Sequence, residues 1–184
     1  MIKKKLFVVL IVLVVLPATI FASVYFFRIK QLPQLTDYDK REEVTLLYEV
    51  YRTKSFRGIE DISPEEILLD SNDNYVFVDI REENEKNISI IPGAISFDNF
   101  EKDVEDYLDK KIIAYCTIGN RSGQYVKVLD NKNIDAYNLI GGILLWVHDG
   151  GEVVSPAGNI TKKVHVSRPR WNLLPKGYTG FYNN

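Results

Sequence analysis

This sequence contains very little cysteine and histidine, the residues on which disulfides and most metal sites depend. Cys116 is the only cysteine among 184 residues, so the chain cannot form an internal disulfide. Cys116 is therefore either a small buried packing residue or a reactive thiol. The two histidines, His148 and His165, have no cysteine nearby and lack the spacing of metal ligands. We predict that both lie at the surface and bind no metal.

An excess of positive charge is also missing. The chain has 23 basic and 25 acidic residues, and residues 1–27 contain three of the lysines and no acidic residue. Residues 28–184 therefore carry 20 basic and 25 acidic residues, a net charge of about −5. Without a basic stripe, the composition gives no support for nucleic-acid binding. The sequence likewise has no internal repeat and no low-complexity tract.

Charge is absent altogether from residues 6–27. A helix of this length spans about 33 Å, which is enough to cross the apolar core of a bilayer. Lysines at positions 3–5 precede the run, and cationic flanks tend to stay in the cytoplasm. We therefore predict a protein of the cell membrane with one transmembrane helix. Its N-terminus would be cytoplasmic, and the rest of the chain would lie in the periplasm or outside the cell.

A cleaved signal peptide is the alternative interpretation of this run. Its apolar core would be Leu6–Leu16, and cleavage would follow Ala22. However, the large Ile20 stands where a small residue is preferred, and the sequence stays apolar through Phe27. These two features favour the uncleaved anchor, and both interpretations export the rest of the chain.

The remainder of the sequence alternates between short apolar runs and helical patterns. Residues 75–80 and 111–116 are compact apolar runs, typical of strands that are buried on both faces of a parallel sheet. This alternation predicts an α/β fold with a mainly parallel central sheet flanked by helices. Further strands are expected within residues 91–97 and 135–142, and helices over residues 99–108, 121–132 and 143–148. The side chains expected to face the core are Phe100, Val104 and Leu108 in the first of these helices, and Tyr125, Val128 and Leu129 in the second.

Two earlier helices have clear signals of their own. Ser63 and Glu66 form a capping box around Pro64, so we expect a helix to begin at Ser63. Another helix is expected over residues 37–54, where one stripe is apolar and should pack on the domain: Val44, Leu47, Tyr48 and Tyr51.

The chain thus divides into four predicted segments. Residues 1–27 form the anchor, residues 28–60 a linker and amphipathic helix, residues 61–153 the α/β domain, and residues 154–184 an irregular tail. Arg168, Arg170 and Trp171 in the tail could contact lipid headgroups or a partner protein. A tail packed on the domain is the favoured interpretation.

Cys116 stands at the end of a predicted strand, just before the helix expected from Arg121. Ligands gather at the carboxyl ends of parallel strands, so the connecting residues form a candidate binding loop. Backbone N–H groups in such a loop, together with a helix N-terminus, favour an anion, and they favour a thiolate for the same reason. Gly119 permits a tight turn with positive φ. Arg121 can offer a planar fork of donors to an anionic substrate, and Ser122 can bond back into the loop.

Four short motifs, in order, resemble the single-domain rhodanese-like sulfurtransferases. The sequence C-x-x-G-x-R-S at residues 116–122 is similar to the active loop of that family. The segments VDIRE (78–82), IPGAISF (91–97) and LIGGILLW (139–146) resemble its other signature elements. The similarity covers residues 61–153 and implies a rhodanese-like domain there. Ser89 and Ile90 depart from the Gly-His that often precedes Ile-Pro-Gly-Ala in the family.

This resemblance implies sulfur transfer through a persulfide on Cys116, with no metal or organic cofactor. The thiolate would take the outer sulfur of thiosulfate or a similar small anion and pass it to cyanide, a thiol or a protein acceptor. Asp79 and Arg81 would brace nearby loops through an ion pair. The residues implied to bind the substrate are Thr117, Ile118, Gly119, Asn120, Arg121 and Ser122.

Two other functions are weighed against this one. Related phosphatases and arsenate reductases use a longer C-x5-R loop, whereas Cys116 and Arg121 here form C-x4-R, so we rank phosphatase activity well below sulfur transfer. The second alternative is a binding module that docks a partner, or delivers persulfide sulfur to it, without turnover of small donors. The presence of both Cys116 and Arg121 favours an enzyme.

Overall fold

The computed structural model describes residues 23–24, 26–27, 30, 34–70 and 74–182. The chain divides into two compact units, residues 1–35 and residues 36–184. Among the described residues, no helix combines the length and the apolar character needed to span a membrane. Most of the predicted anchor, residues 6–27, lies outside the described residues. The anchor and the cleaved signal peptide therefore both stay predictions, which N-terminal sequencing of the mature protein would separate.

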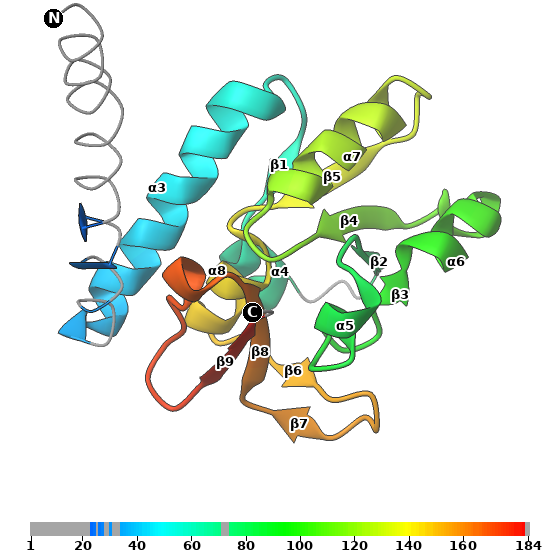
Figure 1. The fold of residues 1–184 in the computed structure, drawn as a ribbon. Coiled ribbons are helices and arrows are strands. Elements are labelled where there is room, and N and C mark those ends of the chain that lie inside the picture. The colour runs from blue at the N-terminus through cyan, green and yellow to red at the C-terminus, as the bar shows by residue number, and fades with distance from the viewer. Residues whose placement is uncertain (1–22, 25, 28–29, 31–33, 71–73, 183–184) are drawn as a thin grey trace, which may run out of the picture. The chain divides into compact units, whose positions relative to one another are not determined.

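The second unit is built around a sheet of five strands that are all parallel, in the order β1-β5-β4-β2-β3 (Figure 1). The predicted α/β fold with a mainly parallel central sheet is confirmed. Four residues of β4 in succession, Ile112 to Tyr115, are buried, because helices cover both faces of the sheet. The strands are β1 (Asp61–Ile62), β2 (Tyr75–Asp79), β3 (Ile95–Ser96), β4 (Lys111–Tyr115) and β5 (Ala136–Leu139).

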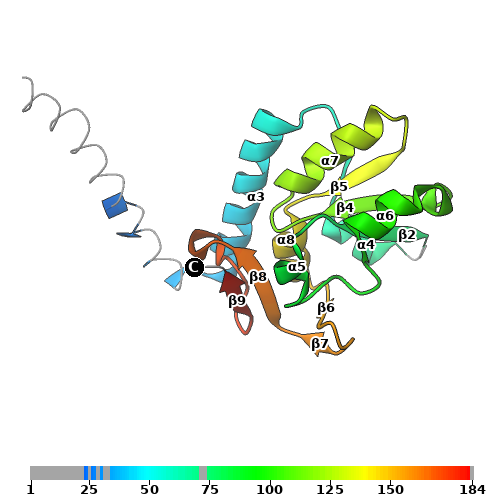
Figure 2. The same ribbon diagram turned by 45° about the vertical axis from the view of Figure 1, so that its right-hand side comes forward.

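Helices lie on both faces of this sheet (Figures 1 and 2). One face shares a hydrophobic core with α3 (Asp37–Ser55), α6 (Phe97–Lys102) and α7 (Asn120–Asp130). On the other face, Phe77 packs edge-on against Trp146 of α8 (Gly142–His148). The short helices α4 (Pro64–Leu69) and α5 (Glu83–Lys86) follow β1 and β2.

Both predicted early helices are present. The capping box at Ser63 is formed, with Pro64 as the first residue of α4. Helix α3 packs on α7 and α8 through the predicted stripe, in which Val44 and Tyr48 are buried. Burial of this stripe joins α3 to the α/β domain.

The helix predicted over residues 99–108 is wrong in both its limits and its length. Ser96 caps α6 at an earlier position, and the backbone at Asp103 (φ −126°, ψ 37°) ends it. A 3₁₀ turn, η3 (Val104–Tyr107), follows, and Leu108 is exposed rather than in the core. Only Phe100, the first residue of the predicted apolar stripe, lies in an α-helix that packs on the core, because α6 ends before Val104 and Leu108.

The inward face of α7 also differs from the prediction. Tyr125 and Leu129 are buried as expected, but Val128 is exposed and Val126 takes its place in the core. Gly123 lies on the same buried face, close to the ring of Phe56, since a Cβ at Gly123 would lie 2.5 Å from that ring.

The C-terminal segment is more regular than the predicted tail. It contains β6 (Val153–Val154), which pairs antiparallel with β7 (Ile160–Thr161), and β8 (Lys163–Ser167), which pairs parallel with β9 (Thr179–Tyr182). A 3₁₀ turn, η4 (Pro169–Trp171), lies between β8 and β9. Strand formation follows from the β-branched residues Val164 and Val166, which are fully buried. The segment packs on the domain, where Ile90 and Val154 exchange backbone hydrogen bonds.

The prediction that both histidines lie at the surface is wrong. His165, in β8, is buried among neighbouring strands and helices. His148 is half-buried, and its Nε2 lies 2.7 Å from the carbonyl oxygen of Leu173. Burial lowers the pKa of His148. Each ring is buried by a contact between the C-terminal segment and the domain, since β8 packs on α5 and Leu173 lies against His148, and such contacts are not visible in the spacing of the histidines.

Candidate functional site

Cys116 directly follows β4 at the carboxyl edge of the sheet, and residues 116–119 lead into α7. Gly119 has a φ of 88°, the positive value predicted for it, and its N–H group donates to the Cys116 sulfur at 3.2 Å. The start of α8 holds the loop from behind, since the Ile143 N–H donates to the Cys116 carbonyl at 2.9 Å. Strand end, glycine turn and two helix N-termini together fix the position of the sulfur.

Most N–H groups of this loop remain available to a ligand. Within the described part of the chain, the N–H of Gly119 has an acceptor, while those of Thr117, Ile118 and Asn120 have none. Unpaired N–H groups are normal at the first turn of a helix and favour a negative charge. The loop can therefore stabilise an anion beside the sulfur.

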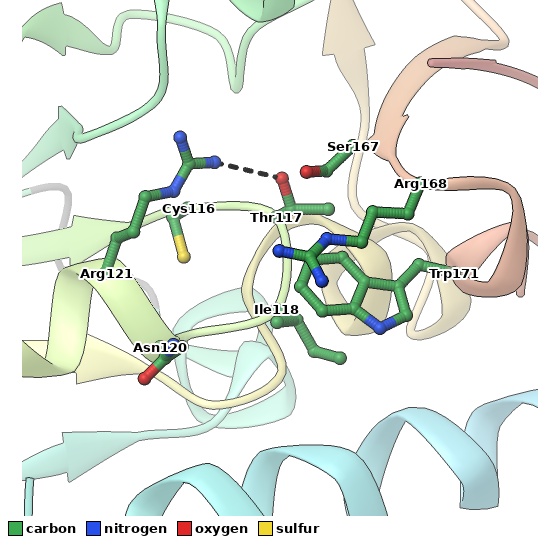
Figure 3. A pocket seen from close by; sticks show the side chains of 8 residues that line it. All are labelled: Cys116, Thr117, Ile118, Asn120, Arg121, Ser167, Arg168 and Trp171. Atoms are coloured by element: carbon green, nitrogen blue, oxygen red, sulfur yellow. Dashed lines mark hydrogen bonds between the residues drawn. The ribbon is translucent and has the colours of Figure 1, made fainter. Parts of the chain in front are cut away.

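Cys116 is almost fully buried. The residue is 1 % exposed. It lies at the wall of a cavity of about 240 Å³ that Thr117, Ile118, Asn120 and Arg121 also line (Figure 3). The C-terminal segment contributes the remaining lining residues, which are Ser167, Arg168 and Trp171. Access to the sulfur is therefore through this cavity.

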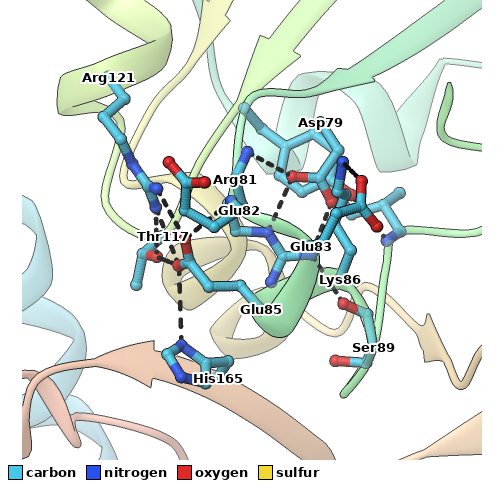
Figure 4. A network of polar contacts seen from close by, with 12 residues as sticks. Asp79, Arg81, Glu82, Glu83, Glu85, Lys86, Ser89, Thr117, Arg121 and His165 are labelled. Atoms are coloured by element: carbon cyan, nitrogen blue, oxygen red, sulfur yellow. Dashed lines mark hydrogen bonds and ion pairs between the residues drawn. The ribbon is translucent and has the colours of Figure 1, made fainter. Parts of the chain in front are cut away.

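Arg121 lines the cavity but is paired with a carboxylate of the protein. Its Nη1 and Nη2 atoms donate to Glu85 at 2.6 and 2.9 Å, and Nη2 also lies 3.3 Å from the Thr117 hydroxyl (Figure 4). Burial lowers the pKa of Arg121, but the hydrogen bonds that it donates to Glu85, together with its interaction with Cys116, outweigh this and raise it. The predicted fork of free donors is thus occupied by Glu85.

Glu85 is a residue of the candidate site that the sequence did not single out. It stands at the third position of α5, where its carboxylate accepts from the N–H of Glu82 at 3.0 Å and from the Thr117 hydroxyl at 2.9 Å. Burial alone would raise the pKa of Glu85, but the hydrogen bonds and charge of Arg121 lower it to about 2. Glu85 therefore ties α5 to the cysteine loop as a carboxylate.

The other predicted loop residues are in different positions. Ser122 is fully buried, and its hydroxyl has no hydrogen-bond partner among the described residues, so it does not bond back into the loop. Neither Ser122 nor Gly119 lines the cavity. The carbonyl of Gly119 instead accepts from the side chain of Asn138 at 3.1 Å. The turn is thus anchored to β5.

Asp79 and Arg81 form a buried ion pair beside the site rather than in it (Figure 4). The carboxylate of Asp79 accepts from Arg81 at 2.9 and 2.6 Å and from the Tyr115 hydroxyl at 2.5 Å. Arg81 also donates to the carbonyl of Ser89 at 2.7 Å, which ties the end of β2 to the segment before β3. Burial lowers the pKa of Arg81, but the charge of Asp79 outweighs this and raises it. The pairing matches the bracing role predicted for these residues.

Gly119→Ala is expected to destabilise the protein for two reasons. A positive φ is unfavourable for alanine, and the new Cβ would lie 2.6 Å from the ring of Tyr48. Together they should lower the free energy of unfolding by about 2–5 kcal/mol. Gly58→Ala is the matched control, because Gly58 has a φ of +83° with nothing within 4 Å. Urea unfolding should show a smaller loss of unfolding free energy for the control, about 1–2 kcal/mol. If both variants lose the same amount, the contact with Tyr48 does not contribute to the loss.

Comparison with known proteins gives the following matches. Residues 63–149 match the family model described as a rhodanese-like domain. A rhodanese-related protein from Thermoplasma volcanium is 26 % identical, with a TM-score of 0.46; the match covers 52 % of this chain and 97 % of that chain. A rhodanese-like domain protein from Staphylococcus aureus is 28 % identical, with a TM-score of 0.44; the match covers 53 % of this chain and 100 % of that chain. No curated protein matches the chain.

Proposed function

We propose, because residues 63–149 match the family model of a rhodanese-like domain, that this protein transfers sulfane sulfur through a persulfide on Cys116. The donor would be thiosulfate or a similar small anion, and the acceptor cyanide, a thiol or a protein. The observation that carries the proposal is the position of the Cys116 sulfur. It lies at a cavity, at the start of α7, with the Gly119 N–H 3.2 Å away.

The reaction would proceed in two displacement steps. After the thiol has lost its proton to solvent, the thiolate of Cys116 attacks the outer sulfur of thiosulfate. A sulfur–sulfur bond to Cys116 forms as the bond within thiosulfate breaks, and sulfite leaves with the electron pair. Cyanide or a thiolate then attacks the outer sulfur of the persulfide, which releases the Cys116 thiolate. The two steps together return Cys116 to its starting state and need no outside oxidant or reductant.

The surroundings of Cys116 support both steps. The persulfide would carry its negative charge on the outer sulfur, and the N–H groups of Thr117, Ile118 and Asn120, which have no acceptor among the described residues, could donate to it. Such preorganised donors stabilise charge without reorganisation. The short loop from Cys116 to Arg121 supports sulfur transfer over phosphatase chemistry, since phosphatases of related fold use one residue more.

Treatment of the purified protein with thiosulfate tests the proposal directly. Mass spectrometry should find one additional sulfur atom on Cys116, and cyanide should remove it with release of thiocyanate. Cys116→Ser should gain no sulfur and should lose turnover. If the wild-type protein gains no sulfur, or if Cys116→Ser retains full turnover, Cys116 is not the sulfur carrier.

A binding or delivery module is the second candidate, and the burial of Cys116 favours it. A cysteine that is 1 % exposed, beside an Arg121 already held by Glu85, suits slow release to a docked partner. A module of this kind would form the persulfide but show no steady-state turnover with small acceptors. Steady-state assays with cyanide and with thiols, run beside the mass measurement, therefore separate an enzyme from a module.

A further inference from the structure

The cavity at Cys116 includes a cation from outside the rhodanese-like domain. We propose that Arg168, in the C-terminal segment, binds the anionic group of the sulfur donor, the role that the sequence assigned to Arg121. This inference rests on the proposed function, because it concerns the same cavity and the same class of donor. Four observations carry it: the pairing of Arg121, the lack of an acidic partner for Arg168, the geometry of the turn, and the composition of the cavity.

Arg121 has little charge to offer a donor. Both of its terminal nitrogens donate to Glu85, whose side chain is 4 % exposed and is also held by the Thr117 hydroxyl. The cation and the carboxylate neutralise each other at the cavity wall. A donor anion that approached Arg121 would also meet the negative charge of Glu85.

Arg168 is in the opposite situation. It lines the same cavity, and within the described part of the chain its guanidinium forms no ion pair. Its central carbon lies 4.9 Å from the centre of the Trp171 ring, in a cation–π contact. Figure 3 shows the guanidinium between Thr117 and the indole of Trp171, on the far side of the cavity from Arg121. Arg168 therefore has free donors at the cavity and a rigid surface behind them.

The chain is bent at this point to bring Arg168 to the cavity. Ser167 has a φ of 64°, a left-handed conformation that side chains other than glycine rarely adopt. The Ser167 N–H donates to Nδ1 of His165 at 3.2 Å, and the Arg168 N–H donates to the carbonyl of Val166 at 2.7 Å. Trp171, which is buried, bonds back to the carbonyl of Arg168 at 2.9 Å. Backbone strain that the surroundings hold in place is typical of ligand sites.

The cavity therefore suits donors that carry a fixed negative charge. A guanidinium binds two oxygens of a sulfonate-type group side by side, which a lysine cannot do. The sulfane sulfur would face Cys116 while the oxygens face Arg168, with Ile118 and Trp171 forming apolar walls. We expect thiosulfate and organic thiosulfonates to be preferred over uncharged polysulfides.

Arg168→Ala should weaken the use of thiosulfate at least tenfold in kcat/KM, mainly through KM, which is the effect expected for loss of a charge-assisted hydrogen bond. The kcat/KM of Arg168→Lys should lie between those of Arg168→Ala and the wild type. Arg170→Ala is the matched control: Arg170 lies 5.7 Å from the same Trp171 ring but does not line the cavity. Its KM should stay near that of the wild type. The inference would be overturned if the KM of Arg168→Ala equalled that of the wild type. It would also be overturned if, of the two variants, only Arg121→Ala had a raised KM.

A binding measurement separates this inference from the proposed function. Calorimetric titration of thiosulfate into Cys116→Ser, and into Cys116→Ser combined with Arg168→Ala, measures anion binding without chemistry. Binding that is lost in the double variant supports the role of Arg168 even if wild-type Cys116 gains no sulfur. Equal binding by both proteins overturns that role even if Cys116 carries a persulfide. Absence of binding to Cys116→Ser, together with absence of sulfur on wild-type Cys116, overturns both proposals.

Discussion

Asp79→Ala is expected to lower the free energy of unfolding by about 3–5 kcal/mol, because it leaves the charge of Arg81 buried without its partner. The side chains of the pair are 0 % and 1 % exposed, so water cannot replace the lost carboxylate without local opening. The Tyr115 hydroxyl loses its acceptor as well. Thermal unfolding followed by circular dichroism should show a melting temperature that is lower by roughly 10 °C or more.

Two further variants test whether the buried charge is the cause. Replacing both partners, with Asp79→Leu and Arg81→Met, should recover most of the loss, because an apolar pair of similar size is often as stable as a buried ion pair. Asp103→Ala, which removes an exposed pair with Lys102, should change the free energy of unfolding by about 0.5 kcal/mol or less. If the double replacement is as unstable as Asp79→Ala, the loss comes from packing or from the unpaired Tyr115 hydroxyl, and not from the unpaired charge.

The predictions that succeeded are those in which local sequence determines local structure. The apolar runs ending at Asp79 and Tyr115 are strands, because helices cover both sides of the sheet and every position must be apolar. Ser63 caps a helix through atoms only three residues away. Gly119 takes a positive φ because the chain must turn sharply between β4 and α7.

The features that the sequence did not indicate depend on residues far away in the chain. Arg121 was predicted to bind the substrate, a role that stays a prediction, and its partner in the structure is Glu85, 36 residues earlier. The spacing of Glu82 and Glu85 could have suggested a helix start, yet it gives no indication that the carboxylate reaches the cysteine loop. Likewise, Arg168 reaches the cavity only because the C-terminal segment pairs β8 with β9 and folds back on the domain.

The burial of Cys116 has the same origin. The sequence left open whether Cys116 is a buried packing residue or a reactive thiol. The C-terminal segment adds Ser167, Arg168 and Trp171 at this edge, and the loop is covered as a result. A segment with no clear period gave no sign of this cover, because its short strands are stabilised by contacts with the domain and with each other.

Glu85→Gln is expected to remove about 3 kcal/mol of stability at neutral pH and to change how stability depends on pH. The folded protein lowers the pKa of Glu85 from the usual 4.5 to about 2, at about 1.4 kcal/mol for each pH unit. A carboxylate with a lowered pKa stabilises the fold above its unfolded pKa, and this contribution is lost as the pH falls through the folded one. The wild-type protein should therefore lose this stability between pH 4.5 and about pH 2.

Urea unfolding at several pH values compares the two proteins. The difference between wild type and Glu85→Gln should be constant above about pH 5, shrink below pH 4.5 and nearly vanish near pH 2. Glu83→Gln, on the exposed side of α5, is the control and should follow the wild type within about 0.5 kcal/mol throughout. A difference that persists unchanged to pH 2 would mean that Gln disturbs packing, since the other carboxyl groups titrate in both proteins and cancel in the difference. Because the same carboxylate holds Arg121 and Thr117, loss of its charge in acid should also loosen the loop that carries Cys116.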